Sequence, residues 1–172
     1  MPIALTVTPC TLPVAGNVCF NINATYYVTA QPIYVWPGTS PYQIIGQAGI
    51  VNVLSVRDPE EYILPLTPVD LTEVSQLITN SVATTTVPFP HISMTQAQFN
   101  QQAFKAATVI EQWAKPILIH CSTGDRASAA FAAFLITYGG LTNAEAVQFA
   151  TTKLALQNPQ FIAWLQAYRP PK

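Results

Sequence analysis

The strongest chemical signal in the sequence is a cysteine that is followed closely by a glycine and an arginine. Residues 120–128 read His-Cys-Ser-Thr-Gly-Asp-Arg-Ala-Ser, and Cys121 comes directly after an apolar stretch. The thiolate is the nucleophilic form of cysteine, and backbone N–H groups, a helix N-terminus or a nearby arginine each lower the pKa of a thiol. Because residues 121–128 offer all three, we expect Cys121 to act as a catalytic nucleophile. The competing interpretation is a cysteine that only fills space in a core.

The residues after Cys121 have the composition of a loop that binds an anion. If residues 121–126 curl around one point, their N–H groups converge, and Gly124 allows the positive φ that such a curl needs. Arg126 can then hold two oxygen atoms of a tetrahedral anion. The predicted anion-binding residues are Ser122, Thr123, Gly124, Asp125, Arg126 and Ala127.

Two further residues of this segment are predicted to take part in catalysis. Ser128 stands at or near the first turn of the following helix, where its hydroxyl can donate to the thiolate or to the sulfur of a covalent intermediate. His120 precedes the nucleophile and can orient the loop through a buried hydrogen bond. The alternative for His120 is an ordinary core histidine whose nitrogens are satisfied by neighbours.

Composition excludes several classes of partner. The chain has 172 residues, half of them hydrophobic, which suits one compact domain. Its net charge is −1 without any basic cluster, so we expect neither a nucleic-acid partner nor a membrane surface. No apolar run approaches the ~20 residues that span a bilayer. Charged residues make up only 9% of the chain, and such a surface is compatible with a homo-oligomer.

The cysteines and the N-terminus favour a cytoplasmic location. Cys10, Cys19 and Cys121 are an odd number and contain no pair with the spacing of a metal site. A reducing compartment is the simplest interpretation, with Cys10 and Cys19 as structural residues. The start of the chain has no basic region ahead of an apolar one. We expect neither a metal nor a cofactor.

The elements that must position Cys121 follow from the apolar patterns. Residues 117–120 form a short apolar strand after Pro116, and residues 127–138 are apolar almost all round, as in a buried helix. Further strands are expected at 26–30, 33–36, 49–56 and 84–87, and helices at 41–47, 71–78, 95–114, from Thr142 and from Asn158. This alternation predicts a three-layer α/β domain, whose mainly parallel central sheet of about four to five strands is flanked by helices. Residues 1–25 are expected to be an extension packed on the domain of residues 26–172.

The reactive segment resembles the active-site signature of cysteine-dependent tyrosine and dual-specificity phosphatases. Those enzymes usually place five residues between the cysteine and the arginine, whereas four separate Cys121 from Arg126. The shorter spacing is similar to that of rhodaneses and of the phosphatase-like family named after beta-lactamase-hydrolase-like proteins. Residues 57–62 look like a rhodanese segment, but residues 140–146 resemble the helix start of the phosphatase-like family. We favour that family, whose resemblance covers about residues 27–155.

The resemblance implies a dual-specificity-phosphatase-like fold and hydrolysis of phosphate monoesters through a phosphocysteine. Cys121 would attack phosphorus, while backbone N–H groups and Arg126 stabilise the equatorial oxygens. The expected partner is a phosphorylated small molecule, a phosphoprotein, or a phosphate- or sulfate-like anion. Two alternatives stay open: sulfur transfer through a Cys121 persulfide, and an anion-binding domain without catalysis.

The proton donor to the leaving group is not evident from the sequence. Phosphatases of the tyrosine class use an aspartic acid from a separate loop, but residues 83–95 contain no acidic residue. The candidates are Asp125 in the loop, Asp58 after the strand at 49–56, and His91 in a proline-rich turn. Arg57 is a further candidate for anion binding, although an ion pair with Glu60 or Glu61 is the alternative.

Overall fold

The computed structural model describes residues 2–10, 12–13, 18–30, 41–57, 76–89, 94–121 and 123–171. Several predictions fall outside this part of the chain. They concern the strand at 33–36, the first five residues of the helix at 71–78, and the side chains of Ser122, Asp58 and His91. Residues 76–79 are helical, which confirms the end of that predicted helix at 76–78.

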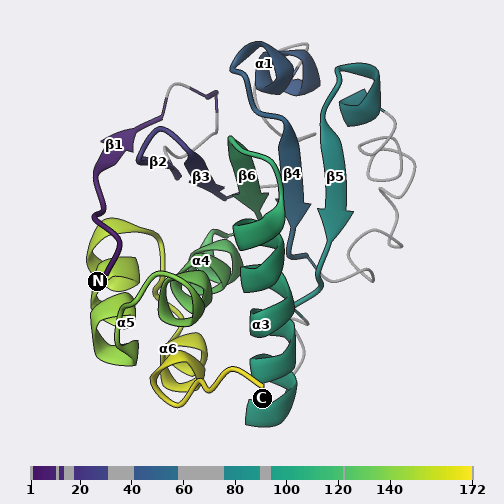
Figure 1. Ribbon diagram of the computed structural model, residues 1–172. Helices are drawn as coiled ribbons and strands as arrows, with labels where there is room; N and C mark the ends of the chain where they lie inside the picture. Colours follow the sequence, from purple (N-terminus) through teal and green to yellow (C-terminus); the bar gives the residue numbers. More distant parts are fainter. Residues whose placement is uncertain are drawn as a thin grey trace.

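The described residues form one six-stranded mixed sheet in the order β1-β2-β3-β6-β4-β5 (Figure 1). The strands are β1 (Val7–Pro9), β2 (Cys19–Ile22), β3 (Tyr26–Thr29), β4 (Asn52–Ser55), β5 (Ala83–Thr86) and β6 (Ile117–His120). β3, β6, β4 and β5 are parallel, whereas β1 and β2 join antiparallel at one edge. The prediction of an α/β fold with a mainly parallel sheet is confirmed, and two strands at the β3 side were not foreseen.

Those two strands come from the first 25 residues. β2 and β3 form a hairpin whose turn residues, Asn23 and Ala24, have φ of 57° and 56°. Positive φ at both positions is the feature of the tight turns that match the twist of paired strands. The Asn23 side chain also fixes the segment before β1, because its Oδ1 accepts from Thr6 N at 2.8 Å and its Nδ2 donates to Ala4 O at 2.8 Å. The segment predicted as an extension therefore contributes to the sheet.

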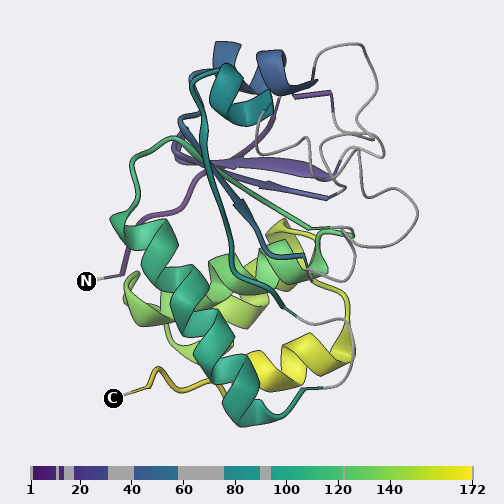
Figure 2. The same cartoon turned by 90° about the vertical axis from the view of Figure 1, so that its right-hand side faces the viewer.

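Helices cover the sheet on both faces, which makes three layers (Figure 2). They are α1 (Pro41–Gln47) on one face, and α3 (Gln96–Gln112), α4 (Asp125–Thr137), α5 (Asn143–Lys153) and α6 (Pro159–Gln166) on the other. Alternating residues of the central strands separate the two cores, since Ile117 and Ile119 pack with the larger group of helices and Leu118 packs on the α1 side. Burial on both faces explains why β6 is apolar as far as Ile119, the residue before His120.

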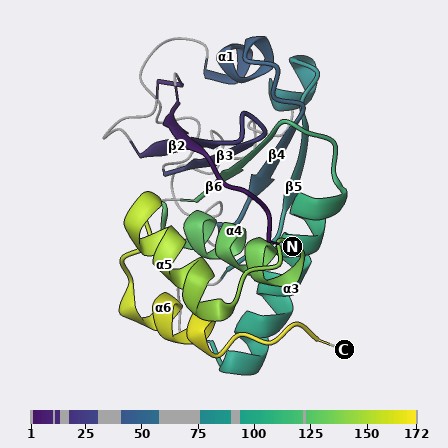
Figure 3. The ribbon, with the colours of Figure 1, turned by 60° about the vertical axis from the view of Figure 1, so that its left-hand side comes forward.

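The helix that follows Cys121 is enclosed by its neighbours (Figure 3). α4 lies between α3 and the pair α5 and α6, and ten of its thirteen residues are buried. The predicted helix starts at Thr95 and Thr142 are confirmed as capping boxes, closed by Gln98 and Glu145. Asn158 caps α6 through its Oδ1. The helices packed around α4 therefore hold its start in place.

The expectation of three reduced cysteines is wrong. Cys10 and Cys19 form a disulfide, with Cα atoms 5.6 Å apart. Strand pairing explains it, because Pro9 lies opposite Phe20, and the next residues in this register are Cys10 and Cys19. An odd number of cysteines does not exclude one bonded pair. Disulfides persist mainly in oxidising compartments, so this bond removes the cysteine argument for a cytoplasmic location, which stays a prediction. Within the described ranges, no helix is long and apolar enough to cross a membrane.

Candidate active site

A four-residue connection joins the central strand β6 to α4 and carries the predicted nucleophile. β6 ends at His120, and α4 begins at Asp125. Gly124 is the N-cap residue of α4 and has a φ of 96°, a left-handed conformation that favours glycine. The predicted positive φ is confirmed. Residues 121–124 are called the Cys121 loop below. Gly124 in this conformation brings its own N–H and that of Ala127 in α4 toward the Cys121 sulfur.

The sulfur of Cys121 is the point on which these N–H groups converge. Cys121 is fully buried, and its Sγ accepts hydrogen bonds from Gly124 N at 3.1 Å and from Ala127 N at 3.4 Å. A cysteine that only fills a core would be surrounded by apolar groups. Cys121 packs within the larger apolar core, yet two amide donors also reach its sulfur, and such donors at a helix N-terminus favour the thiolate.

Opposing effects act on the ionisation of Cys121. Burial is the largest effect, and it raises the pKa of the thiol. The amide of Ala127, the positive charge of Arg126, and the amides of Gly124 and Arg126 lower the pKa. Desolvation prevails, so the pKa of the Cys121 thiol lies above its ordinary value, and the charge of Arg126 and the amide of Ala127 offset only part of that rise.

Arg126 lies inside the protein beside the loop. Its side chain is only 7% exposed, and its Nη1 donates to the carbonyl oxygen of Phe89 at 3.1 Å. Phe89 follows β5, and its own N–H donates to Val56 O at 3.2 Å. Val56 N in turn donates to His120 O at 3.0 Å. Hydrogen bonds therefore link the segments at the carboxyl ends of β5, β4 and β6, and the guanidinium of Arg126 is bonded to the first of them. In open α/β sheets, sites lie beyond these strand ends.

Phe89 was missed by the sequence interpretation, which treated residues 88–91 only as a turn. Its ring is fully buried and packs against Phe99, with ring centres 5.9 Å apart, and against Phe161 at 6.5 Å. A large aromatic between two prolines was the only available signal. The packing fixes the backbone whose carbonyl holds Arg126.

Two of the predicted anion-binding residues, Thr123 and Asp125, bond to each other, and Asp125 also bonds to a distant part of the chain. Thr123 is exposed, and its Oγ1 donates to Asp125 Oδ2 at 3.3 Å. Asp125 Oδ1 accepts from the backbone N–H groups of Gln157 at 2.7 Å and Asn158 at 2.8 Å. These two residues belong to the α5–α6 connection, residues 154–158. The Asp125 carboxylate is therefore bonded to this connection.

Ser128 and His120 are both fully buried. Ser128 Oγ accepts a hydrogen bond from Ala155 N at 3.2 Å, so this hydroxyl is also engaged with the α5–α6 connection. His120 is the last residue of β6, opposite Ser55 of β4 and Thr29 of β3. Arg57 lies two residues after β4, whose last residue, Ser55, is opposite His120. Arg57 is buried, with 5% of its surface exposed.

Small side chains form the wall behind Gly124. A methyl group added at Gly124 would lie 3.0 Å from Ala155 Cβ, 3.1 Å from Val18 Cγ1 and 3.6 Å from Ala30 Cβ. Separations of this kind leave no room for a side chain. The sequence interpretation did not identify Val18, Ala30 or Ala155, because each comes from a distant part of the chain and has no reactive group.

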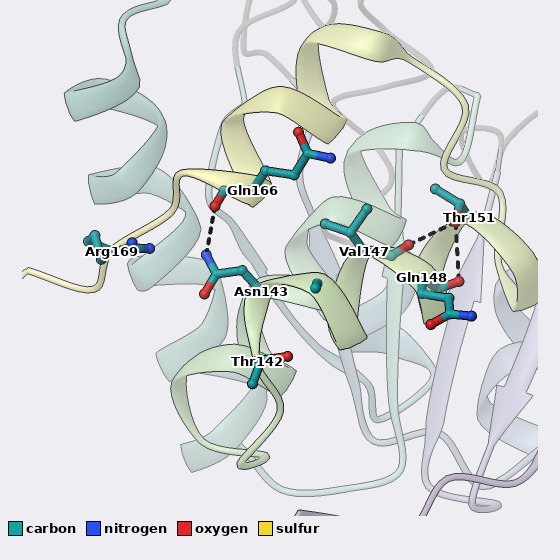
Figure 4. A pocket seen from close by; sticks show the side chains of 8 residues that line it. Thr142, Asn143, Val147, Gln148, Thr151, Gln166 and Arg169 are labelled. Atoms are coloured by element: carbon teal, nitrogen blue, oxygen red, sulfur yellow. Dashed lines mark hydrogen bonds between the residues drawn. The ribbon is translucent and has the colours of Figure 1, made fainter.

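A hollow of about 580 Å³ is lined by residues outside the Cys121 loop. Figure 4 shows the side chains of this lining. The lining includes Asn143, Gln148 and Thr151 of α5, with Gln166 and Arg169 at the end of the chain. It contains no residue of the Cys121 loop and no cysteine or histidine, so it is not the chemical site. Among the residues that the structure describes, no group of three His, Cys, Asp or Glu side chains is arranged to hold a metal ion.

Solved structures share this fold. Tk-PTP matches with a TM-score of 0.63 at 18% sequence identity, over 84% of this chain and 89% of its own. Kinase associated phosphatase, in a form with the catalytic-site cysteine replaced by serine, gives 0.62 at 15% identity, over 96% and 93%. TpbA of P. aeruginosa in complex with pTyr gives 0.59 at 13% identity, over 94% and 86%.

These matches define the class of fold. No protein-family model and no curated protein matches the sequence. The chain has the fold of the tyrosine and dual-specificity phosphatases, as the sequence predicted. Within that fold, the Cys121 loop occupies the end of the central parallel strand β6.

Proposed function

We propose that this protein is a cysteine-dependent phosphatase, which hydrolyses phosphate monoesters through a phosphocysteine on Cys121 without a metal ion. The main support is the environment of Cys121 Sγ, which accepts hydrogen bonds from Gly124 N and Ala127 N beside the buried Arg126. The fold shared with kinase associated phosphatase, whose catalytic site holds a cysteine, supports the same chemistry.

The first chemical step forms the sulfur–phosphorus bond. The Cys121 thiolate attacks phosphorus, and the bond between phosphorus and the ester oxygen breaks, so the leaving group departs with the bonding electron pair and takes up a proton. Charge on the three nonbridging oxygens is stabilised by the loop amides and by Arg126. The Phe89 carbonyl fixes the guanidinium, so little reorganisation is needed when the anion binds.

The second step releases phosphate. A water molecule attacks phosphorus and loses a proton, the sulfur–phosphorus bond breaks, and the electron pair returns to Sγ as a thiolate. The amides of Gly124 and Ala127 point at this sulfur and stabilise the negative charge that it regains. The same donors therefore favour both the attacking and the departing thiolate.

The proton donor for the first step is proposed from the remaining candidates. Asp125 directs its carboxylate oxygens to the α5–α6 connection and to Thr123, which favours Asp58 or His91 as the general acid. Ser128 and His120 are proposed to support the loop from inside the protein, since both are fully buried.

The substrate class proposed is a phosphate monoester of an aromatic alcohol or a small metabolite. TpbA, which shares the fold, was solved with pTyr, and this favours phosphotyrosine-like esters as first substrates to test. Membership of the beta-lactamase-hydrolase-like phosphatases is proposed from the four-residue spacing between Cys121 and Arg126. We further propose that residues 26–172 supply the catalytic machinery. Self-association stays a prediction from composition, and a cytoplasmic location stays a prediction from the N-terminal sequence.

Hydrolysis of p-nitrophenyl phosphate tests the proposal. Its leaving group is stable as an anion, so turnover depends little on the general acid. We expect phosphate release in the presence of a chelator, and a loss of about 10⁴-fold or more in Cys121→Ser. Equal rates in the wild type and in Cys121→Ser, with several aryl phosphates and a reductant for Cys121, would contradict the proposal.

Two further assays separate the alternatives. Transfer of sulfur from thiosulfate to cyanide, with a gain of one sulfur atom on Cys121, would mark a sulfurtransferase. Binding of inorganic phosphate by calorimetry, without turnover of any ester, would mark an anion-binding domain. The phosphatase proposal predicts phosphate binding together with turnover, and no stable persulfide.

A further inference from the structure

The α5–α6 connection is fastened to the start of α4 by side chains beside Cys121. Asp125 Oδ1 accepts hydrogen bonds from the N–H groups of Gln157 and Asn158, at 2.7 and 2.8 Å. Three residues after Asp125, Ser128 Oγ accepts from Ala155 N at 3.2 Å. Three backbone amides of one short connection therefore donate to two side chains in the first turn of α4.

Asp125 also binds the Cys121 loop itself. Its Oδ2 accepts a hydrogen bond from Thr123 Oγ1 at 3.3 Å, and its backbone N–H donates to the same Thr123 oxygen at 3.4 Å. One carboxylate thus joins the loop to a connection that follows more than 30 residues later in the chain. A charged acceptor with two amide donors makes a stronger link than a neutral acceptor would.

The α5–α6 connection leads on to the residues that hold Arg126. Asn158 caps α6, and its Oδ1 accepts from Phe161 N at 3.4 Å. The ring of Phe161 is stacked on Phe89, whose carbonyl accepts from Arg126 Nη1 at 3.1 Å. A path of direct contacts therefore runs from the Asp125 carboxylate through α6 to the guanidinium.

We propose that Asp125 is a positioning residue, which holds the loop amides and Arg126 in the anion-binding arrangement and takes no part in proton transfer. The inference rests on the phosphatase function proposed above. The Asp125 oxygens are bonded to Gln157, Asn158 and Thr123. Cys121 Sγ instead accepts from Gly124 N in the loop and from Ala127 N in α4. The site is built on rigid elements, and Asp125 supplies the support that keeps it rigid.

Two substitutions separate positioning from acid chemistry. Asp125→Asn keeps an Oδ1 that can accept from both amides, and its Nδ2 can donate to the Thr123 hydroxyl oxygen, but it has no acidic proton to give. Asp125→Ala removes every one of these bonds. Thr142→Ala serves as the matched control, because it removes the N-cap of α5 by a similar deletion without touching the loop.

Steady-state hydrolysis of p-nitrophenyl phosphate and of a phosphotyrosine peptide is measured for the four proteins as a function of pH. We expect Asp125→Ala to lose about 30-fold in kcat/KM, since small displacements of catalytic groups carry losses of this order. Asp125→Asn should recover at least about a third of the wild-type value, with a pH profile of unchanged shape. Thr142→Ala should keep the wild-type kcat/KM. Equal losses in Asp125→Asn and Asp125→Ala, or none in Asp125→Ala, would overturn the positioning role.

Hydrogen exchange distinguishes a failure of this inference from a failure of the proposed function. The amides of Gly124 and Ala127 should exchange faster in Asp125→Ala than in the wild type, in Asp125→Asn or in Thr142→Ala. This readout needs no turnover, so it decides the positioning role even if the wild type hydrolyses no phosphate ester. Unchanged exchange at both amides in Asp125→Ala would contradict the inference, whatever the activity.

Discussion

The two cysteine-containing regions of the molecule differ in what surrounds the sulfur. Cys10 and Cys19 are bonded to each other at the edge of the sheet, where β1 and β2 pair. Cys121 lies at the end of the central strand β6, and its Sγ receives two backbone N–H groups beside a buried arginine. The same residue type thus forms a disulfide in one region and is the proposed nucleophile in the other.

A short stretch of chain connects the two regions. Val18 precedes Cys19, and its carbonyl accepts from Ala30 N at 2.9 Å. Its Cγ1 would lie 3.1 Å from a methyl group added at Gly124. The disulfide-bonded edge therefore supplies one wall of the Cys121 loop. The edge of the sheet that holds the disulfide therefore limits the space around the Cys121 loop. The start of α4 and Arg126 determine the electrostatic environment of the Cys121 sulfur.

The largest expected effect on activity comes from removing the positive charge beside Cys121. Arg126→Ala removes the guanidinium that would stabilise the nonbridging oxygens, so kcat/KM for p-nitrophenyl phosphate should fall about 10³-fold. A Cys10→Ala/Cys19→Ala double variant is the control from the other region, and its kcat/KM should fall by no more than about threefold. A loss of less than about tenfold in Arg126→Ala would show that the loop acts without this residue.

The next effect tests the space around the loop. Gly124→Ala places a methyl group 3.0 Å from Ala155 Cβ on a backbone with a φ of 96°. We expect a loss of about 2 to 4 kcal/mol in the free energy of unfolding and about 10²-fold in kcat/KM. Gly49→Ala is the matched control, because Gly49 has a φ of 83° but nothing within 4 Å of the added methyl.

Urea unfolding and steady-state kinetics on both glycine variants check this prediction. Gly49→Ala should lose only about 1 to 2 kcal/mol, the conformational cost of a positive φ, and keep its activity. Should both variants lose activity equally, close packing at Gly124 would not be what the loop requires.

A smaller effect on activity is expected from the disulfide. The Cys10→Ala/Cys19→Ala variant should unfold about 2 to 3 kcal/mol more easily, because the bond closes a short loop in the unfolded chain. Its kcat/KM should fall only about threefold, through looser packing of Val18 on Gly124. A large loss of activity at unchanged stability would mean that the edge takes a direct part in the chemistry.

The smallest effect concerns the ionisation of Cys121. The charge of Arg126 lowers the pKa of the buried thiol, so Arg126→Ala should raise that pKa further. A higher pKa leaves less thiolate below it, and alkylation by iodoacetamide near neutral pH should slow several-fold in the variant. The two alkylation rates should converge at alkaline pH, where the Cys121 thiol is ionised in both proteins. Faster alkylation of Arg126→Ala at neutral pH would reverse the sign and contradict the assignment.

Features that depend only on neighbouring residues could be predicted from the sequence. Neighbouring residues determine the strand before Cys121, the buried helix after it, the positive φ at Gly124 and the helix starts at Thr95 and Thr142. All of these predictions are confirmed. Local periodicity and capping chemistry carry such information directly.

Features that depend on long-range pairing were not predictable. The Cys10–Cys19 bond follows from the register of β1 on β2, which the alternation of residues alone does not determine. The contact between Arg126 and Phe89 joins segments 37 residues apart. The amides that bind Asp125 follow it by more than 30 residues, and a carboxylate in a reactive loop looks the same in sequence whether it donates protons or holds a backbone.

Trapping the covalent intermediate on Cys121 examines the proposed chemistry most directly. The protein is mixed with p-nitrophenyl phosphate, quenched within the first turnovers, digested, and analysed by mass spectrometry. We predict that the peptide containing Cys121 gains one phosphoryl group, that Cys121→Ser shows far less of it, and that the peptides of Cys10 and Cys19 gain none. Turnover without phosphoryl gain on Cys121, or phosphoryl gain on another residue, would contradict a phosphocysteine mechanism.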